Sequence, residues 1–209
     1  MPRLFVLLAV ATLNVTALGQ QAGPDIKPGD VVAVKNAADN QTADFKIITP
    51  KGFVAFSVGG DWPVIAMQSK LPVAAAGFQI PNSADESTTD STNLAITVYD
   101  EATSKGRDAL GTVGRAYGQK PPTIDHRKNW VIYTQESKQE DTVYTVLDGK
   151  SKVADVAVAI RLAWPHLANN KQGYDEEMKA LFYRVLDSIR GSLGPYKPQP
   201  NDVIRRPDT

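Results

Sequence analysis

The sequence predicts an α+β fold, in which an antiparallel β-sheet arranged as a meander packs against two helices. Short β-like segments occupy the first half of the chain and return after residue 129, with a stretch of helical periodicity between them. An amphipathic helix closes the pattern near residue 190. Because 209 residues with 42% hydrophobic side chains suffice for one core, we expect a single α+β domain over residues 45–192.

Residues 1–19 have the three parts of a secretory signal peptide. Arg3 supplies the positive charge, an apolar run extends from Leu4 to Ala11, and small residues stand at positions 17 and 19, where a signal peptidase selects them. A membrane anchor is the alternative, but the apolar run falls short of the roughly 20 residues that span a bilayer. We therefore expect an exported protein, periplasmic or extracellular, that begins at Gln20 and has no transmembrane segment.

The next part of the chain predicts an arm followed by short strands. Residues 20–44 are rich in Gly, Pro, Asn and Ala and indicate a loosely held N-terminal arm with one possible strand, Val31 to Val34. β-branched and aromatic residues between turn formers then predict four strands. These strands are residues 45–49, 53–58, 64–68 and 77–80. Residues 81–93 contain Ala84 as their only apolar residue, and they predict a solvated loop.

The middle of the chain predicts a strand, a helix and a meander. Residues 94–99 alternate apolar and polar side chains, and residues 103–119 then follow the spacing of one helix face. Three further strands follow, and Asp148-Gly149 is a dipeptide that favours a hairpin turn after the second of them. These strands are residues 130–135, 142–147 and 153–164.

A closing helix from about Tyr174 to Arg190 carries an apolar stripe. The stripe consists of Met178, Leu181, Phe182, Val185, Leu186 and Ile189. We expect it to pack on the apolar face of the last strand, with Gly191 as the helix C-cap. That strand face consists of Val156, Val158, Ile160 and Leu162. The Pro-rich tail, residues 193–209, has almost no apolar residues, and we expect it not to dock on the domain.

Three parts of the sequence match a known family. They are Phe56-Ser57-Val58 leading to Asp61-Trp62, the strand that ends at Tyr99, and the closing helix with its end Val185-Leu186-Asp187-Ser188-Ile189-Arg190. Their order resembles the PsbP-like α/β sandwich family, seen in photosystem-associated lumenal proteins and bacterial periplasmic relatives. The resemblance spans roughly residues 45–190. It implies a binding or assembly-factor scaffold, usually without catalysis, and it transfers no catalytic residue.

Composition and motifs narrow the function further. The 23 Lys and Arg balance 23 Asp and Glu, so no overall field attracts nucleic acid, and the absence of cysteine excludes thiol nucleophiles and cysteine-ligated metals. Neither a G-x-S-x-G elbow nor a phosphate-binding loop occurs, and His126 and His166 lack the HExxH spacing. We predict no cofactor, no metal and no catalytic residue.

These exclusions favour a non-catalytic binding or accessory protein of the cell envelope or exterior, whose partner would be another exported or envelope protein. Two alternatives stay open, a small secreted hydrolase that uses carboxylates and a carrier of a small apolar ligand. Six residues are candidates for a ligand or partner surface: Trp130, Tyr133, Tyr144, His166, Arg115 and Arg127. The aromatic residues could line a cleft, His166 follows a strand end, and the arginines belong to a basic stretch. The alternatives are that the aromatic residues pack in the core, that His166 forms only local hydrogen bonds, and that the arginines lie on a solvated surface.

Overall fold

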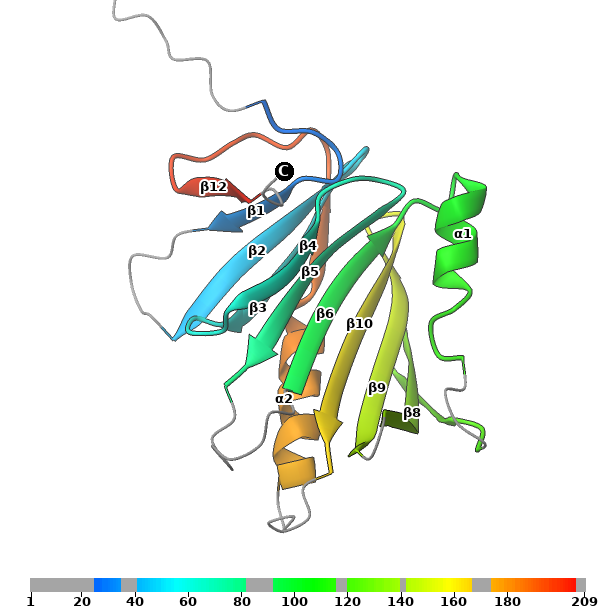
Figure 1. Ribbon diagram of the computed structural model, residues 1–209. Helices are drawn as coiled ribbons and strands as arrows, with labels where there is room; N and C mark the ends of the chain where they lie inside the picture. Colours follow the sequence, from blue (N-terminus) through cyan, green and yellow to red (C-terminus); the bar gives the residue numbers. More distant parts are fainter. Residues whose placement is uncertain are drawn as a thin grey trace, which may run out of the picture.

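The computed structural model describes residues 25–34, 41–81, 92–115, 120–139, 142–166 and 174–205. Over these residues the protein is mostly β, with two antiparallel sheets and two helices (Figure 1). The predicted fold class, one antiparallel sheet packed against two helices, is therefore wrong. The reason is that the strands predicted at 45–49 and 53–58 do not extend the meander, but pair with segments from both ends of the chain in a sheet of their own.

The small sheet has five strands in the order β11-β3-β2-β1-β12. They are β1 (Val31–Val34), β2 (Thr42–Thr49), β3 (Gly52–Gly59), β11 (Arg190–Leu193) and β12 (Asp202–Arg205). Val31 and Val32 are fully buried, and β1 pairs on one side with β2 and on the other with β12. The possible strand in the predicted arm is thus an interior strand of this sheet, paired on both sides.

The large sheet has seven strands in the order β4-β5-β6-β10-β9-β8-β7. They are β4 (Val64–Gln68), β5 (Val73–Ile80), β6 (Thr92–Tyr99), β7 (Thr123–Arg127), β8 (Trp130–Gln139), β9 (Thr142–Val153) and β10 (Val156–Pro165). β6 pairs with β10, so the strands before the first helix and the meander after it form one sheet.

The hairpin between β9 and β10 differs from the prediction. Its turn is Ala154–Asp155, where both residues have positive φ, 48° and 63°, whereas Asp148-Gly149 lies inside β9. Asp148 faces Arg161 across the strand pair and accepts two hydrogen bonds from its guanidinium, at 2.7 and 3.0 Å. A Cβ on Gly149 would lie 3.3 Å from Phe182 Cζ, so the glycine lets the closing helix approach the sheet. Both residues therefore have roles inside the strand rather than in a turn.

Each helix lies on a different face of the large sheet. α1 (Ser104–Leu110) is shorter than the predicted 103–119, because residues 111–114 are turns, and the glycines of this stretch weaken a helix. It packs on what we call the outer face, beside Tyr99 and Ala157. α2 (Tyr174–Ser188) covers the inner face, and the predicted stripe is buried there from Met178 to Leu186. Gly191 belongs to β11 and is not a helix cap.

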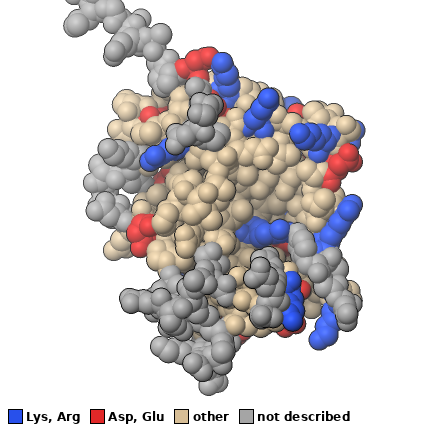
Figure 2. All heavy atoms as spheres, in the orientation of Figure 1, with Lys and Arg blue, Asp and Glu red and all other residues tan. Residues whose placement is uncertain are grey.

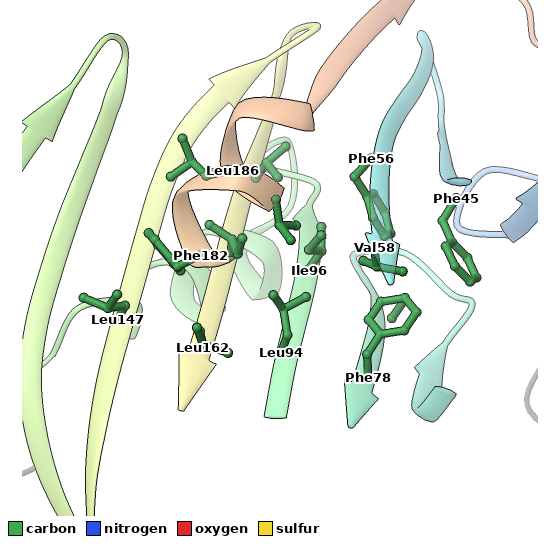
Figure 3. Close-up of a cluster of buried hydrophobic side chains, with 14 of the residues drawn as sticks. Phe45, Phe56, Val58, Phe78, Leu94, Ile96, Leu147, Leu162, Phe182 and Leu186 are labelled. Atoms are coloured by element: carbon green, nitrogen blue, oxygen red, sulfur yellow. The ribbon is translucent and has the colours of Figure 1, made fainter. Parts of the chain in front are cut away.

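The main core lies between the small sheet, α2 and the inner face of the large sheet. Figure 3 shows Phe182 and Leu186 of α2 beside Leu147 and Leu162 of the large sheet. At the other end of the cluster, where the two sheets meet, Phe45 of β2 stacks on a neighbour in β3 and meets a β5 ring edge-on. These ring pairs are Phe45–Phe56, with centroids 5.7 Å apart, and Phe45–Phe78, at 5.0 Å.

The outer face of the large sheet carries mostly small side chains away from α1. Ala75 and Gly77 of β5 stand opposite Thr97 and Ala95 of β6 on this face. Figure 2 shows this side of the molecule as a broad central area without charged side chains, with Lys and Arg toward its margins. The two cavities described below lie on the other face, beside α2.

The tail docks on the small sheet, so the prediction that residues 193–209 do not dock is wrong for the part described. β12 pairs with β1, and Asp202 is the centre of a polar cluster. Lys46 Nζ donates to Tyr196 Oη at 3.1 Å and to Asp202 Oδ1 at 3.4 Å, and the Gln199 N–H donates to Asp202 Oδ2 at 2.6 Å. The Tyr196 hydroxyl also donates to Asp202, and its ring meets Phe53 edge-on.

Candidate functional site

α2 lies over the inner face of the large sheet and has a cavity on each flank. On the side of the small sheet is a cavity of about 460 Å³, which we call the apolar groove. On the side of β8 and β9 is a cavity of about 570 Å³, which we call the polar pocket. Both volumes lie within the range of about 300–1,000 Å³ that is usual for small-molecule sites.

The apolar groove is formed by the ends of β2 and β3, the turn after β3 and one side of α2. Its lining consists of Gln41, Thr42, Ser57, Val58, Gly59, Asp61, Trp62, Ile80, Pro81, Tyr174, Glu177, Met178, Leu181, Arg184, Val185 and Ser188. The aliphatic side chains and Met178 belong to the main core, so the floor of the groove is largely apolar.

Trp62 forms one wall of the apolar groove, and Gly59 allows it to do so. The backbone N–H of Trp62 donates to the Gly59 carbonyl at 3.2 Å, which closes a tight turn after β3. A Cβ on Gly59 would lie 2.2 Å from Trp62 Nε1, closer than any real contact, so the indole lies directly against the glycine backbone. Trp62 is only partly buried, and its remaining surface is available to a ligand.

Charged groups stand at the rim of the apolar groove. Asp61, Glu177 and Arg184 are exposed and line it, giving two carboxylates against one guanidinium. At the buried end, the hydroxyls of Tyr174 and Thr92 are hydrogen-bonded at 2.9 Å. Burial raises the pKa of Tyr174, and the neighbouring Glu177 adds to this, so the phenol is neutral at physiological pH. The groove therefore combines an apolar body with a charged opening.

The polar pocket is built on three neighbouring strands. Glu136, Thr145 and Trp164 stand opposite one another in register on β8, β9 and β10, and all three line the pocket. The Thr145 hydroxyl and His166 Nε2 are hydrogen-bonded at 2.6 Å, and the Trp164 indole N–H donates to Asp175 Oδ1 at 2.7 Å. The rest of the lining consists of Lys120, Pro121, Thr123, Thr134, Gln135, Ser137, Lys138, Val143 and Lys179.

The six predicted site residues do not come together. Trp130 is 4% exposed and belongs to the main core. Tyr133 lies half-buried on the outer face, with Lys150 Nζ 4.9 Å from its ring centroid. Tyr144 is a partly buried residue of β9, and His166 lies beside the polar pocket through its bond to Thr145.

The two predicted arginines contact the protein itself. The Arg115 Nε donates to the Gly111 carbonyl at 2.8 Å. Arg127 pairs with Asp187 of α2 at 2.6 Å, and its guanidinium lies 5.0 Å from the Tyr183 ring centroid. Hydrogen bonds from Arg127 lower the pKa of Asp187. Arg127 therefore ties the β7–β8 turn to α2. A ligand role for any of the six residues stays a prediction.

Sequence reasoning missed the residues that line the two cavities. Trp62 stood out only through the family resemblance, although an aromatic residue after Gly59-Gly60 indicates a ring held at a tight turn. Arg184 and Glu177 carry no signal of their own, because charged residues beside an apolar stripe occur in every amphipathic helix. Their part in the groove follows only from the placement of α2 beside β3.

In the parts of the chain that the structure describes, no helix is long and apolar enough to cross a membrane. Within the same residues, His, Asp and Glu form no group of three that could hold a metal ion. Comparison with known proteins finds no family model, no curated protein and no solved structure that matches the chain, so the PsbP-like resemblance stays a prediction.

Proposed function

We propose that the chain is an exported binding protein that holds a small amphipathic ligand in the apolar groove. One observation supports this most directly: the groove has a core-like floor and a partly exposed indole wall, but a charged rim. A ligand with an apolar body and a polar end matches both parts. This proposal modifies the carrier alternative of the sequence analysis, which specified a small apolar ligand, by adding a polar end to the ligand and naming the residues that would bind it.

The charge of the rim favours a cationic end on the ligand. Asp61 and Glu177 outnumber Arg184, so the described residues at the opening have a formal charge of −1 (one positive minus two negative). The indole of Trp62 adds to this preference, because cations are attracted to aromatic faces and tryptophan is the strongest partner. We therefore expect an alkylammonium group to be preferred over a carboxylate on the same alkyl chain.

Export and an envelope partner remain parts of the proposal that rest on sequence. Residues 1–19 support export, and the resemblance to the PsbP-like family supports a binding role. N-terminal sequencing of the protein recovered outside the cytoplasm tests export directly. A start at Gln20 would support it, and a start at Met1 on the exported form would contradict it.

Binding is tested by titrating the full chain with decyltrimethylammonium below its micelle-forming concentration, with decanoate as the chain-matched anion. We expect saturable binding of the cation, weaker binding of decanoate, and a loss of at least about tenfold in affinity in Trp62→Ala. Tyr133→Ala is the matched control, because Tyr133 is a partly buried aromatic residue on the outer face. No saturable binding, or equal affinity in Trp62→Ala and the wild type, would overturn the proposal.

A further inference from the structure

The polar pocket lies on the flank of α2 opposite the apolar groove, and its charge has the opposite sign. Three lysines line it: Lys120, Lys138 and Lys179. Two carboxylates oppose them, Glu136 and Asp175, and Asp175 already accepts a hydrogen bond from the Trp164 indole. Among the described residues of the lining, the formal charge is therefore +1 (three positive minus two negative), which favours an anion.

Lys179 can leave its present partner for a ligand. Its ammonium pairs with Glu176 at 3.4 Å, and the two side chains are 42% and 78% exposed. Exposed pairs of this kind contribute only about 0–1 kcal/mol. An anion that is buried in the pocket, or held there by several hydrogen bonds, would easily compete with Glu176 for Lys179.

Hydroxyl groups line the same pocket. They belong to Thr123, Thr134 and Thr145, which lie on the same face of the sheet as Glu136. Thr145 is held by its 2.6 Å hydrogen bond to His166 Nε2, so its side chain has a fixed position next to Glu136. A hydroxyl both donates and accepts, and a carboxylate accepts, so this lining suits the hydroxyl groups of a ligand.

We propose that the polar pocket is a second binding site, and that it takes a small anion that carries hydroxyl groups. A sugar with one carboxylate or one phosphate is the simplest such ligand. The lysines pair with the anionic group, while Glu136 and the hydroxyls of Thr134 and Thr145 bind the ring hydroxyls. The volume of about 570 Å³ has room for one monosaccharide. This proposal is independent of the ligand in the apolar groove.

The test is isothermal titration calorimetry of the purified protein at one ionic strength with four probes. D-Glucuronate and glucose 6-phosphate carry both features, glucose has only the hydroxyls, and inorganic phosphate has only the charge. We expect at least one of the two anionic sugars to bind, with glucose and phosphate each weaker by about tenfold or more. The tighter of the two sugars identifies the anionic group.

Variants assign the binding to this pocket. Lys138→Gln combined with Lys179→Gln should weaken the anionic sugar by about tenfold or more, and Thr145→Val should weaken it without changing the fold. Lys152→Gln is the control, because Lys152 is an exposed lysine of β9 on the outer face. Circular dichroism and thermal melting show that each variant is folded.

Three results would overturn the proposal. The first is that neither anionic sugar produces binding heat. The second is that inorganic phosphate binds as tightly as glucose 6-phosphate, which would mean that the hydroxyl groups are not recognised. The third is a Lys138→Gln/Lys179→Gln variant that is folded and binds the sugar as the wild type does.

Discussion

The closing helix and the tail behind it are neighbours in the sequence, yet they dock by different means. α2 buries five residues of one apolar stripe against the large sheet and the small sheet. The tail docks through the backbone pairing of β12 with β1 and through the polar cluster of Lys46, Tyr196, Gln199 and Asp202. The apolar contacts of α2 recur along the helix, whereas the docking of the tail depends on a few specific contacts.

This difference explains why one segment was predicted and the other was not. An apolar stripe has a period that can be read from fifteen consecutive residues of α2. The partner of Asp202 is Lys46, which lies 156 residues earlier in the chain, and nothing near either residue indicates the pair. A tail with few apolar residues and no apolar stripe can therefore still be a structural part of the domain.

The largest expected effect comes from truncating a buried apolar side chain of α2. Leu186 is 1% exposed, and Leu186→Ala should lower the free energy of unfolding by about 2–5 kcal/mol, because it leaves a cavity between α2 and the sheet. Lys179→Gln on the same helix should change it by less than about 0.5 kcal/mol. Urea denaturation measures both, and equal small effects would mean that α2 is not docked.

An intermediate effect is expected from the polar cluster. The side chain of Asp202 is 1% exposed, and Asp202→Asn should lower the free energy of unfolding by about 1–3 kcal/mol through weakened hydrogen bonds and a lost charge. Asp155→Asn is the control, because Asp155 forms an exposed pair with Lys51 at 3.6 Å and should contribute less than about 1 kcal/mol. A similar, small loss in both variants would show that the tail is not held by this cluster.

The contribution of Asp202 should depend on pH. Burial alone would raise the pKa of Asp202, but hydrogen bonds from Tyr196 and the Gln199 N–H, with the charge of Lys46, lower it overall. A carboxyl group whose pKa is lower in the folded state stabilises that state above its unfolded pKa, and this is lost as the pH falls through the folded value. The stability difference between the wild type and Asp202→Asn should be full near neutral pH and shrink below about pH 4. A constant difference down to pH 2 would contradict this.

The distinction between a local sequence pattern and a partner far away in the chain also holds for the rest of the fold. The predicted strands 45–49, 53–58, 64–68 and 94–99 lie within β2, β3, β4 and β6, because each has a local pattern. Which sheet a strand joins depends on long-range pairing, such as Arg190 of β11 opposite Ala55 of β3, and the local sequence does not indicate that pairing. A turn was wrongly predicted at Asp148-Gly149, because the turn preference is a property of the dipeptide itself. The residues that it contacts in the fold, Arg161 and Phe182, lie elsewhere in the chain.

The sequence did not indicate where the two cavities lie. Of the six residues chosen, only His166 lies beside one of the two cavities, through Thr145. The residues that line the cavities come from distant segments that meet only where α2 lies over the sheet, such as Trp62 and Arg184. Aromatic and basic residues were chosen for their type, but type alone does not say which of them face a cavity.

α2 separates the apolar groove from the polar pocket, and the three tryptophans can test in one measurement whether the amphipathic cation binds in the groove alone. Trp62 lines the apolar groove and Trp164 lines the polar pocket, while Trp130 is a core residue that belongs to neither lining. Each indole N–H gives one signal in a ¹H–¹⁵N correlation spectrum. Decyltrimethylammonium should shift the Trp62 signal and leave those of Trp164 and Trp130 in place. A Trp62 signal that stays in place at saturating ligand, or equal shifts of all three, would contradict the account.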